Sequence, residues 1–389
     1  MLNPLTWLSK KRFPYEPLIS VEISRKYLLQ NLKEFRKLTN QNNIAPVLKS
    51  NAYGHGIVEI AKIIETACKE DSNLNKNTPF FVIDSYFEAL ALRSKGIKTP
   101  LLIIGYNRPQ VLLNPNLKKV SYAITSLDTL QKIQKTTKTI NIHLKIDTGM
   151  HRQGILIDQI PEALQIIKNN KKINLEGICS HLSDSDNTDP SFTKLQIETW
   201  NNVVDKITTE FPDIKYIHLS NTYGHKYSSL IKANVSRLGI GLYGLAEGFE
   251  NNLNLKPILQ MKTIITGVKN IKKGQTVGYN NTFIANKDTT IATVPIGYFE
   301  GLDRRLSDNG FFEIGKNKIM CPIIGRICMN ISTIDVSEVP DIKIGDEVII
   351  ISNNPNNKNS IQSMAKITQT IPYEIVTYIP EHLKRVVVE

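Results

Sequence analysis

Lys49 stands at the end of an apolar run, in the segment PVLKSNAYGHG over residues 46–56. The run predicts a buried strand, and the residues Tyr53 to Gly56 after it predict a loop before the next helix. Partial burial at a strand end favours a neutral amine, which can attack an aldehyde. A lysine at a strand end is also common as a surface residue whose ammonium reaches solvent, so this residue alone leaves both interpretations open.

Other polar residues close apolar runs in the same part of the chain, among them Asp147, His181 and His218. Eight such runs occur, over residues 44–50, 80–85, 100–106, 120–126, 140–147, 174–182, 216–220 and 235–244. Amphipathic stretches separate them, for example over 85–96 and 192–211. This alternation predicts an α/β fold, a TIM-type (β/α)8 barrel, in which the chemistry gathers where the strands end.

A second domain is expected after the polar stretch EGFENNLNLKP (247–257), where short strands alternate with glycine-containing turns. We therefore expect an N-terminal extension over residues 1–17, the barrel over 18–250 and a smaller, mainly β domain over 251–389. The run LISVEIS (18–24) also has the pattern of a strand, and the sequence does not decide which domain it joins.

The composition of the chain excludes several classes of protein. Its four cysteines are scattered, without a CxxC pair or a Cys/His cluster, which predicts neither disulfides nor a metal site and favours a cytoplasmic protein. No apolar stretch approaches the roughly 20 residues that span a bilayer, so we expect no membrane partner. The formal net charge of +12 comes from lysines spaced along helical faces. We expect no nucleic-acid partner, but the positive potential favours small anionic ligands.

The segment around Lys49 closely resembles the cofactor-lysine signature of alanine racemases. Eight further segments follow in the order of that family, and the resemblance covers the chain from about Leu18 to its end. These segments are LKIDTGMHRQG (144–154), EGICSHLSDSD (176–186), IHLSNT (217–222), VSRLGIGLYG (235–244), TVGYNNTF (276–283), VPIGYFEGLDRRLS (294–307), GRICMN (325–330) and IPYEI (371–375). Nine ordered segments are far more specific than any one of them.

The resemblance implies a homodimer that interconverts L-alanine and D-alanine and supplies D-alanine for peptidoglycan synthesis. Lys49 would carry pyridoxal 5'-phosphate (PLP) as a Schiff base and move a proton on one face of the substrate Cα. Inversion requires a second base on the opposite face, and Tyr279 of the partner subunit matches that base. Without the resemblance, Tyr279 would be interpreted as a tyrosine packed within the β domain.

Arg237 matches the family arginine that faces the pyridine nitrogen of PLP, where many other PLP enzymes place a carboxylate. A guanidinium keeps its protons and can only donate a hydrogen bond. The ring is then left unprotonated and is a poorer electron sink, which favours racemisation over transamination. By the same resemblance Arg152 binds the substrate carboxylate. Lys145 matches a lysine that is commonly carbamylated and orients Arg152, and His181 matches a residue near Tyr279.

The remaining matched residues are assigned to the cofactor and to the substrate pocket. The cofactor residues are Tyr53, Thr222 and the backbone of Gly239 and Ile240, which bind the phosphate, together with Asn221, His181 and His218, the last of which lies near the ring. Tyr298 and Met329 of the partner's β domain help to close the substrate pocket. Taken alone, His218 could equally be a strand-end histidine whose hydrogen bonds are satisfied.

Three features depart from the family pattern. Asn330 stands where many members have aspartate. Glu381 stands where the family has a phosphate-binding tyrosine, and Tyr378 lies three residues earlier. An extra N-terminal stretch of about 15 residues has no assigned counterpart.

Three other functions are alternatives to alanine racemisation. A non-catalytic PLP carrier protein would lack the second domain. A decarboxylase of basic amino acids would show a glycine-rich phosphate loop and a partner cysteine in an acidic motif. A racemase for serine or larger side chains is not separated by sequence, because one methylene is worth only about 1 to 3 kcal/mol of discrimination.

Overall fold

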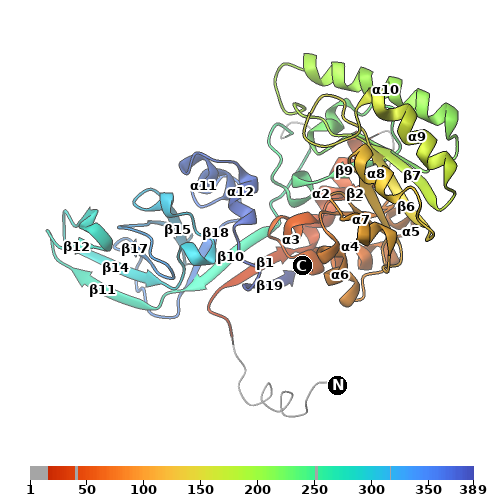
Figure 1. The fold of residues 1–389 in the computed structure, drawn as a ribbon. Coiled ribbons are helices and arrows are strands. Elements are labelled where there is room, and N and C mark those ends of the chain that lie inside the picture. Colours follow the sequence, from red (N-terminus) through yellow and green to blue (C-terminus); the bar gives the residue numbers. More distant parts are fainter. Residues whose placement is uncertain (1–15, 40–42, 250–252, 316) are drawn as a thin grey trace, which may run out of the picture. The chain divides into compact units, whose positions relative to one another are not determined.

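The computed structural model describes residues 16–39, 43–249, 253–315 and 317–389, so most of the expected extension over 1–17 lies outside the described residues. The chain divides into two compact units (Figure 1). The first comprises Ser24–Ile258, and the second comprises Leu259–Val388 together with the segment that ends at Ile23. The division after Ile258 lies eight residues beyond the boundary that the sequence predicts, at residue 250.

The first unit is an α/β unit built on parallel strands. Each of the eight predicted runs contains one strand, so this part of the prediction is confirmed. The strands are β2 (Ile44–Pro46), β3 (Phe81–Ile83), β4 (Leu101–Ile103), β5 (Val120–Ile124), β6 (Ile140–Lys145), β7 (Ile173–Cys179), β8 (Tyr216–His218) and β9 (Ser236–Leu238). Strands β3 to β8 form one parallel sheet in chain order, and β2 pairs with β9.

Hydrogen bonds also connect the pair β2–β9 with the six-stranded sheet. Val47, directly after β2, forms a parallel bridge with Val82 of β3. On the other side, Arg237 N of β9 donates to Ser220 O, just after β8, at 3.1 Å. The strands β3, β4 and β9 are buried along their whole length, as expected for parallel strands covered on both faces.

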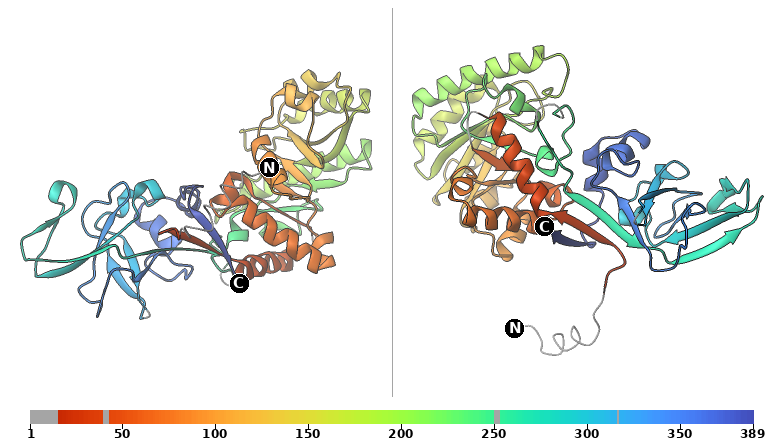
Figure 2. Two further views of the ribbon diagram at one scale, coloured as in Figure 1. Left: turned by 90° about the horizontal axis from the view of Figure 1, so that it is seen from below. Right: turned by 180° about the vertical axis from the view of Figure 1, so that it is seen from behind.

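Helices pack against these strands, as Figure 2 shows from two further sides. They are α2 (Arg25–Leu38), α3 (Lys49–Tyr53), α4 (Ile57–Glu70), α5 (Ser72–Lys76), α6 (Tyr86–Ser94), α7 (Pro109–Leu113), α8 (Leu127–Ile133), α9 (Ile160–Asn169) and α10 (Ser191–Glu210). The helices predicted over 85–96 and 192–211 are α6 and α10. Helix α6 begins with a capping box, in which the Ser85 and Glu88 side chains each accept from the other residue's backbone N–H.

Trp200 anchors helix α10, and its removal is expected to destabilise the α/β unit. The ring is fully buried, and Nε1 donates to Lys232 O at 3.0 Å. Trp200→Ala leaves a large cavity and should lower the free energy of unfolding by about 3–5 kcal/mol. The matched control is Leu195→Ala on the same helix, because Leu195 is 57% exposed. Urea unfolding that gave the same stability for both variants would contradict this packing.

The second unit is mainly β. Its larger sheet has the order β16-β15-β18-β10-β1-β19, and a smaller sheet has the order β11-β14-β17. The strands are β1 (Ser20–Ser24), β10 (Leu259–Ile264), β11 (Gly267–Ile271), β12 (Thr276–Val277), β13 (Phe283–Ile284), β14 (Thr289–Val294), β15 (Phe311–Ile314), β16 (Ile319–Pro322), β17 (Ser332–Asp335), β18 (Glu347–Ile351) and β19 (Lys384–Val388). Two helices, α11 (Ile361–Ile367) and α12 (Pro372–Thr377), complete it.

The strand predicted over 18–24 belongs to this second unit. The sequence had not decided which of the two units it joins. It is β1, and it pairs antiparallel with β10, with Ser20 opposite Lys262 and Ile23 opposite Leu259. Val21 and Ile23 are fully buried, so the strand contributes to the core of the β unit.

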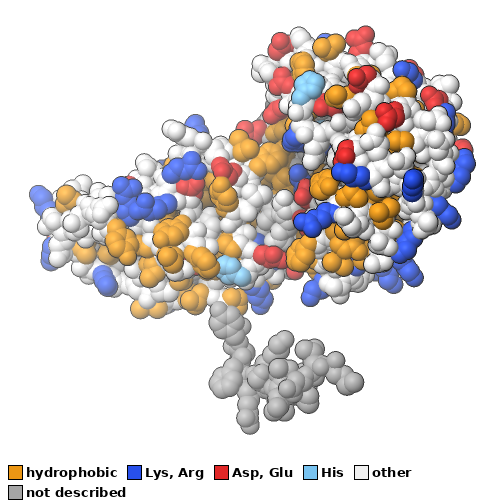
Figure 3. All heavy atoms as spheres, in the orientation of Figure 1, with side chains coloured by type: hydrophobic (Ala, Val, Ile, Leu, Met, Phe, Trp, Pro, Cys, Tyr) orange, Lys and Arg blue, Asp and Glu red, His pale blue; other side chains and the backbone are white. Residues whose placement is uncertain are grey.

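Three general features of the described residues concern membrane spans, cysteines and metal binding. None of the helices in the described ranges is long and apolar enough to cross a membrane. Cys68, Cys179, Cys321 and Cys328 are all free thiols. Within the same ranges no group of three or more His, Cys, Asp or Glu side chains could hold a metal ion. On the face drawn in Figure 3, basic and acidic side chains are interspersed over the α/β unit.

Candidate active site

Lys49 lies three residues after the end of β2 at Pro46 and begins an unusual turn. Residues Ser50 to Tyr53 all have φ between +52° and +55°, so α3 is a left-handed turn. Such a conformation costs roughly 1–2 kcal/mol for each residue with a Cβ, and strain of this kind is concentrated at functional sites. The lysine side chain is half-buried. The sequence predicted only a loop at this point.

Hydrogen bonds from three directions hold the turn in place. Leu48 N donates to Val82 O at 2.7 Å, which fixes the residue before the lysine to the neighbouring strand. Ser50 N donates to Glu88 Oε1 at 2.6 Å, and Ile57 N donates to Asn51 Oδ1 at 2.9 Å. The sequence did not indicate Glu88 as a residue of the site. Its only signal was its position three residues after Ser85, and that pattern predicts no more than a helix cap.

Arg237 is buried, with 7% of its surface exposed, and its guanidinium is held by five contacts. Nη1 donates to His218 O at 3.0 Å and contacts His218 Nδ1 at 2.7 Å. Nη2 donates to Ser180 O at 2.7 Å and Leu219 O at 2.9 Å, and it contacts His181 Nδ1 at 3.2 Å. No carboxylate is among these contacts in the described part of the chain. Burial lowers the pKa of Arg237 from its ordinary value.

The two histidines beside Arg237 are neutral at pH 7. Burial, and then the charge of Arg237, lowers the pKa of His218 well below its ordinary value. Burial and the same charge also lower the pKa of His181 well below its ordinary value. Each Nδ1 that faces the guanidinium must therefore be the unprotonated acceptor, because the arginine can only donate.

Several cations gather around this point. Burial lowers the pKa of Lys145, and the charges of Arg237, Arg152 and Lys49 lower it further. Lys145 Nζ donates to Gln153 Oε1 at 3.4 Å. Arg152 is exposed. The predicted residues Lys49, Lys145, Arg152 and Arg237 therefore lie within one region of positive potential, which suits an anionic ligand.

The predicted phosphate residues form a cradle of small groups and hydroxyls. Gly239 N and Gly241 N donate to Thr222 Oγ1 at 3.2 and 3.3 Å. A Cβ added to Gly239 would lie 2.8 Å from Tyr53 Oη. This close approach favours glycine at position 239. Burial raises the pKa of Tyr53 to about 12, which keeps its hydroxyl a hydrogen-bond donor.

Other residues of the predicted site support this cradle. Ile240 begins the short 3-10 helix Ile240–Tyr243. Asn221 Oδ1 accepts from Gly224 N at 2.8 Å and from Ser185 Oγ, so its oxygen fastens the loop before Thr222. Tyr243 was not predicted. Its hydroxyl donates to Val47 O at 2.7 Å, and this bond ties the cradle to the strand that leads to Lys49.

The second unit carries Tyr279, Tyr298 and Met329, which are 67%, 44% and 54% exposed. Tyr298 N donates to Cys328 O at 3.1 Å, so the loops that carry Tyr298 and Met329 are joined. Tyr279 opens a 3-10 turn over Tyr279–Asn281. A Cβ on the preceding Gly278 would lie 3.1 Å from Arg326 N, so this turn also packs closely on the segment before Met329. The structure thus brings the three residues into one region of the β unit.

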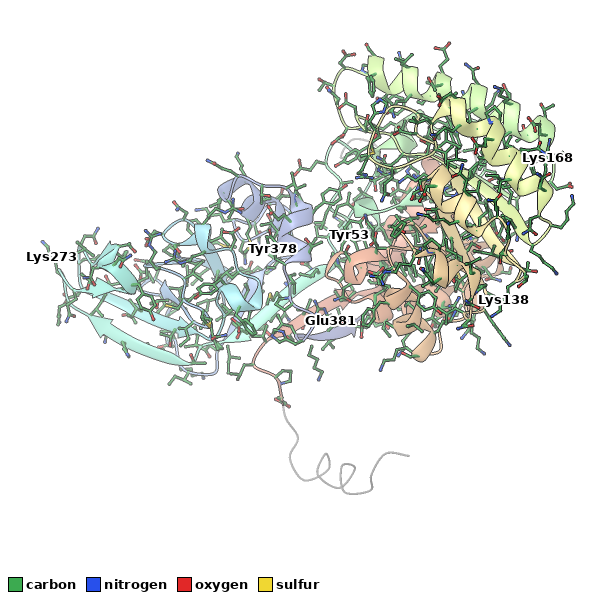
Figure 4. The ribbon with its side chains drawn as sticks, in the orientation of Figure 1. Tyr53, Lys138, Lys168, Lys273, Tyr378 and Glu381 are labelled. Atoms are coloured by element: carbon green, nitrogen blue, oxygen red, sulfur yellow. The ribbon has the colours of Figure 1, made fainter. Side chains whose placement is uncertain are left out.

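Asn330, which differs from the aspartate of many family members, is hydrogen-bonded within the β unit. Its Nδ2 donates to Glu300 Oε1 at 2.6 Å. Figure 4 labels Tyr378, at the end of α12, and Glu381 in the segment that follows. Tyr378 Oη donates to Glu374 Oε1 at 2.6 Å, and that bond raises the pKa of Tyr378. Its hydroxyl is therefore engaged within the β unit.

Comparison with known proteins identifies the family. The model of the alanine racemase N-terminal domain matches residues 23–247, and that of the alanine racemase C-terminal domain matches residues 258–387. The alanine racemase of Lactobacillus acidophilus is 32% identical over 388 residues, covering 96% of this chain and 99% of that protein. The alanine racemase of Fusobacterium nucleatum is 35% identical over 374 residues, covering 95% of this chain and 99% of that protein.

A solved structure agrees with these matches. The alanine racemase of Clostridium difficile 630 superimposes with a TM-score of 0.86 at 29% identity, covering 96% of this chain and 97% of that chain. The matches to alanine racemases therefore include both the α/β unit and the β unit of this chain. The chain belongs to the alanine racemase family.

Proposed function

We propose that this protein is a PLP-dependent alanine racemase that interconverts L-alanine and D-alanine and supplies D-alanine for peptidoglycan synthesis. The observation that carries the proposal is the buried guanidinium of Arg237, which lies in one cationic region with Lys49 and makes no contact with a carboxylate in the described residues. Many PLP enzymes place a carboxylate against the ring nitrogen. An arginine there suits an enzyme that returns the proton to Cα.

The residues present fit the cofactor. Lys49 would hold it covalently through Nζ, with Arg237 at the ring nitrogen and His218 beside the ring. The hydroxyls of Tyr53 and Thr222 and the N–H groups around Gly239 and Ile240 would hold the phosphate, and the missing Cβ of Gly239 leaves room for it. When bound, the cofactor withdraws electrons from the substrate Cα and so makes its proton acidic.

Two bases on opposite faces of Cα then perform the inversion. Lys49 Nζ takes or returns the proton on one face, and Oη of the partner subunit's Tyr279 serves the other. Removal of a proton by a tyrosine requires a phenolate stabilised by nearby positive charge, and His181 with Arg152 would supply that environment. His181 is neutral, so it acts as a hydrogen-bond donor and Arg152 supplies the charge.

Arg152 would bind the substrate carboxylate with its fork of donors. Lys145 is proposed to carry a carbamate, because its lowered pKa makes the neutral, nucleophilic amine accessible. The carbamate would place one negative charge among Arg237, Arg152 and Lys49 and would hold Arg152 in position. Tyr298 and Met329 of the partner subunit would limit the room for the substrate side chain.

The proposal extends to the architecture. We propose that the eight strands of the α/β unit close into a TIM-type barrel, which the Val47–Val82 bridge and the Arg237–Ser220 hydrogen bond support. We also propose that the β unit contributes to the active site of a partner subunit. The four free thiols fit a cytoplasmic protein.

Dimerisation is expected to be obligatory for activity. A single subunit would supply Lys49 without the opposing base, so the active species should sediment as a dimer at assay concentration. Analytical ultracentrifugation under assay conditions measures this. Full activity in a monomeric sample would contradict the shared active site.

Gly239→Ala should weaken cofactor binding. The added Cβ would lie 2.8 Å from Tyr53 Oη and would displace that hydroxyl from the cradle. Overpacking of this kind costs about 1–3 kcal/mol, which corresponds to roughly a 5- to 150-fold higher dissociation constant for PLP. An absorbance titration of the apoprotein measures the constant. An unchanged constant would remove Gly239 from the phosphate site.

The function itself is tested by racemisation rates for a panel of L-amino acids in the presence of PLP. The proposal predicts that alanine is racemised fastest. Activity restricted to serine or to amino acids with larger side chains would mean that the protein is a racemase of the same fold with a substrate other than alanine. Absence of racemisation with cofactor bound would favour a non-catalytic carrier.

A further inference from the structure

A row of polar side chains continues from Arg237 into the interior of the α/β unit. Arg237 Nη1 contacts His218 Nδ1 at 2.7 Å, and His218 Nε2 contacts His143 Nδ1 at 2.7 Å. His143 Nε2 lies 3.6 Å from Glu176 Oε2, which also accepts a hydrogen bond from Ser121 Oγ. We call Arg237, His218, His143 and Glu176 the relay. Its members come from four different strands, β9, β8, β6 and β7.

The backbone is shaped to bring the last two members together. Along β6 and β7, Ile142 pairs with Leu175 whereas His143 pairs with Gly177, so Glu176 is an extra residue at a bulge. A bulge re-aims a side chain, here toward His143. A Cβ on Gly177 would lie 2.7 Å from His143 Nδ1. Any other residue at position 177 would therefore displace the imidazole from the relay.

The donors of the relay all point in one direction. Arg237 can only donate, so His218 Nδ1 must accept, and the proton of that ring is on Nε2. His218 Nε2 then donates to His143 Nδ1, which leaves the second proton on His143 Nε2, facing Glu176. Both rings are fully buried, and burial lowers the pKa of each, so both are neutral at pH 7.

Glu176 supplies the negative charge that Arg237 lacks among its own contacts. An unpaired buried cation is costly, and aligned hydrogen bonds polarise one another toward an anion at their end. Burial pushes the pKa of Glu176 upward, but the interaction with His143 and the hydrogen bond from Ser121 outweigh it, and the pKa lies below its ordinary value. Glu176 is therefore ionised, and two neutral rings connect it to Arg237.

We propose that Glu176 and His143 are positioning residues of the racemase site. They hold His218 with its proton on Nε2, so that its Nδ1 accepts from Arg237 and fixes the guanidinium where the cofactor ring nitrogen needs a donor. This inference rests on the proposed function. Sequence reasoning missed both residues, although His143 lies two positions before Lys145 on one strand and thus on the same face.

The far end of the relay opens on a cavity of about 210 Å³, lined in part by Ser121, His143, Glu176 and Lys215. Water can therefore reach His143 Nε2 once the Glu176 carboxylate is removed. Such a water would be a neutral acceptor in place of the charged one. Arg237 still fixes both protons on Nε2, but loss of the carboxylate should weaken the hold on the His143 ring and, through it, on His218.

The tautomers of His143 and His218 can be determined without the cofactor, from long-range ¹⁵N–¹H spectra of the apoprotein at pH 7. His143→Gln and His218→Gln variants identify the two rings among the seven histidines. The expected result is a proton on Nε2 of both rings. A proton on Nδ1 of either ring, or a charged ring, would overturn the relay.

Variants then test the link to the cofactor. Glu176→Ala should keep both protons on Nε2 but change the ¹⁵N and ¹H shifts of the His143 Nε2–H group, because the charged acceptor is lost, and it should raise the PLP dissociation constant about tenfold, a size typical of outer-shell partners at ligand sites. Glu176→Gln keeps an acceptor and should restore part of both the shifts and the affinity. Asn174→Ala, at an exposed position of the same strand, should change neither.

The outcomes separate this inference from the proposed function. If the wild-type protein binds PLP and Glu176→Ala binds it equally well, the positioning role is wrong and the racemase proposal stands. If the wild-type protein binds no PLP, the proposed function fails, and the apoprotein spectra still decide the tautomers.

Discussion

Lys49→Ala is expected to abolish racemisation, with a loss of more than about 10⁴-fold, because the variant lacks both the covalent anchor of the cofactor and one of the two bases. PLP should still bind non-covalently, since Arg237 and the cradle at Tyr53, Thr222 and Gly239 are unchanged. Racemisation assays and absorbance spectra of the variant measure the two effects separately.

The matched control for this variant is Lys138→Ala, which removes an exposed lysine whose Nζ donates to Asn114 Oδ1 on the surface of the same unit (Figure 4). It should retain full activity. If Lys49→Ala kept more than a small fraction of the wild-type rate, the assignment of the cofactor lysine would be wrong.

Tyr279→Phe is expected to leave the cofactor absorbance intact and to block proton exchange on one face of alanine. The loss in racemisation should be of the order of 10²–10⁴-fold, the contribution of a positioned acid–base group. In deuterated water one enantiomer should still exchange its Cα proton through Lys49, while product of the opposite configuration accumulates slowly. Incorporation of deuterium into each enantiomer, followed by mass spectrometry, measures both faces.

Tyr106→Phe is the matched control, because Tyr106 is 60% exposed on the α/β unit and outside the proposed site. It should leave both exchange and racemisation unchanged. Racemisation at the wild-type rate in Tyr279→Phe would contradict the two-base mechanism and would require a different group on the second face.

The strands of the α/β unit could be predicted because each is a short, β-branched apolar run with a polar residue at its end. Burial on both faces selects such runs, and the helices between them show the 3.6-residue period. The strand β1 could not be assigned in advance, since Val21 and Ile23 would fit the core of either unit. Its pairing with β10 depends on a contact between distant parts of the chain.

The structure also contains local features that sequence patterns do not indicate. Nothing in Ser50, Ala52 or Tyr53 favours a left-handed conformation, and only Asn51 is of a type that adopts it readily. The turn is over-determined by tertiary hydrogen bonds, such as the one from Ser50 N to Glu88. Tertiary contacts of this kind override local preference at functional sites.

Individual residues of the site were matched by resemblance, whereas their surroundings came from the structure. Arg237 was assigned from its motif, but its burial and its two histidine contacts follow only from the packing of several strands. Glu176 begins the family segment EGICSHLSDSD, yet the direction of its side chain toward His143 depends on the bulge between β6 and β7. A bulge leaves no clear signal in a single sequence.

The most direct test of the account is reduction of the purified protein with borohydride after incubation with PLP, followed by peptide mapping. The account predicts that the imine-type absorbance disappears and that one pyridoxyl group is fixed on the peptide containing Lys49. Absence of a trapped group, or its attachment to another lysine while Lys49 stays unmodified, would contradict the claim that Lys49 carries the cofactor.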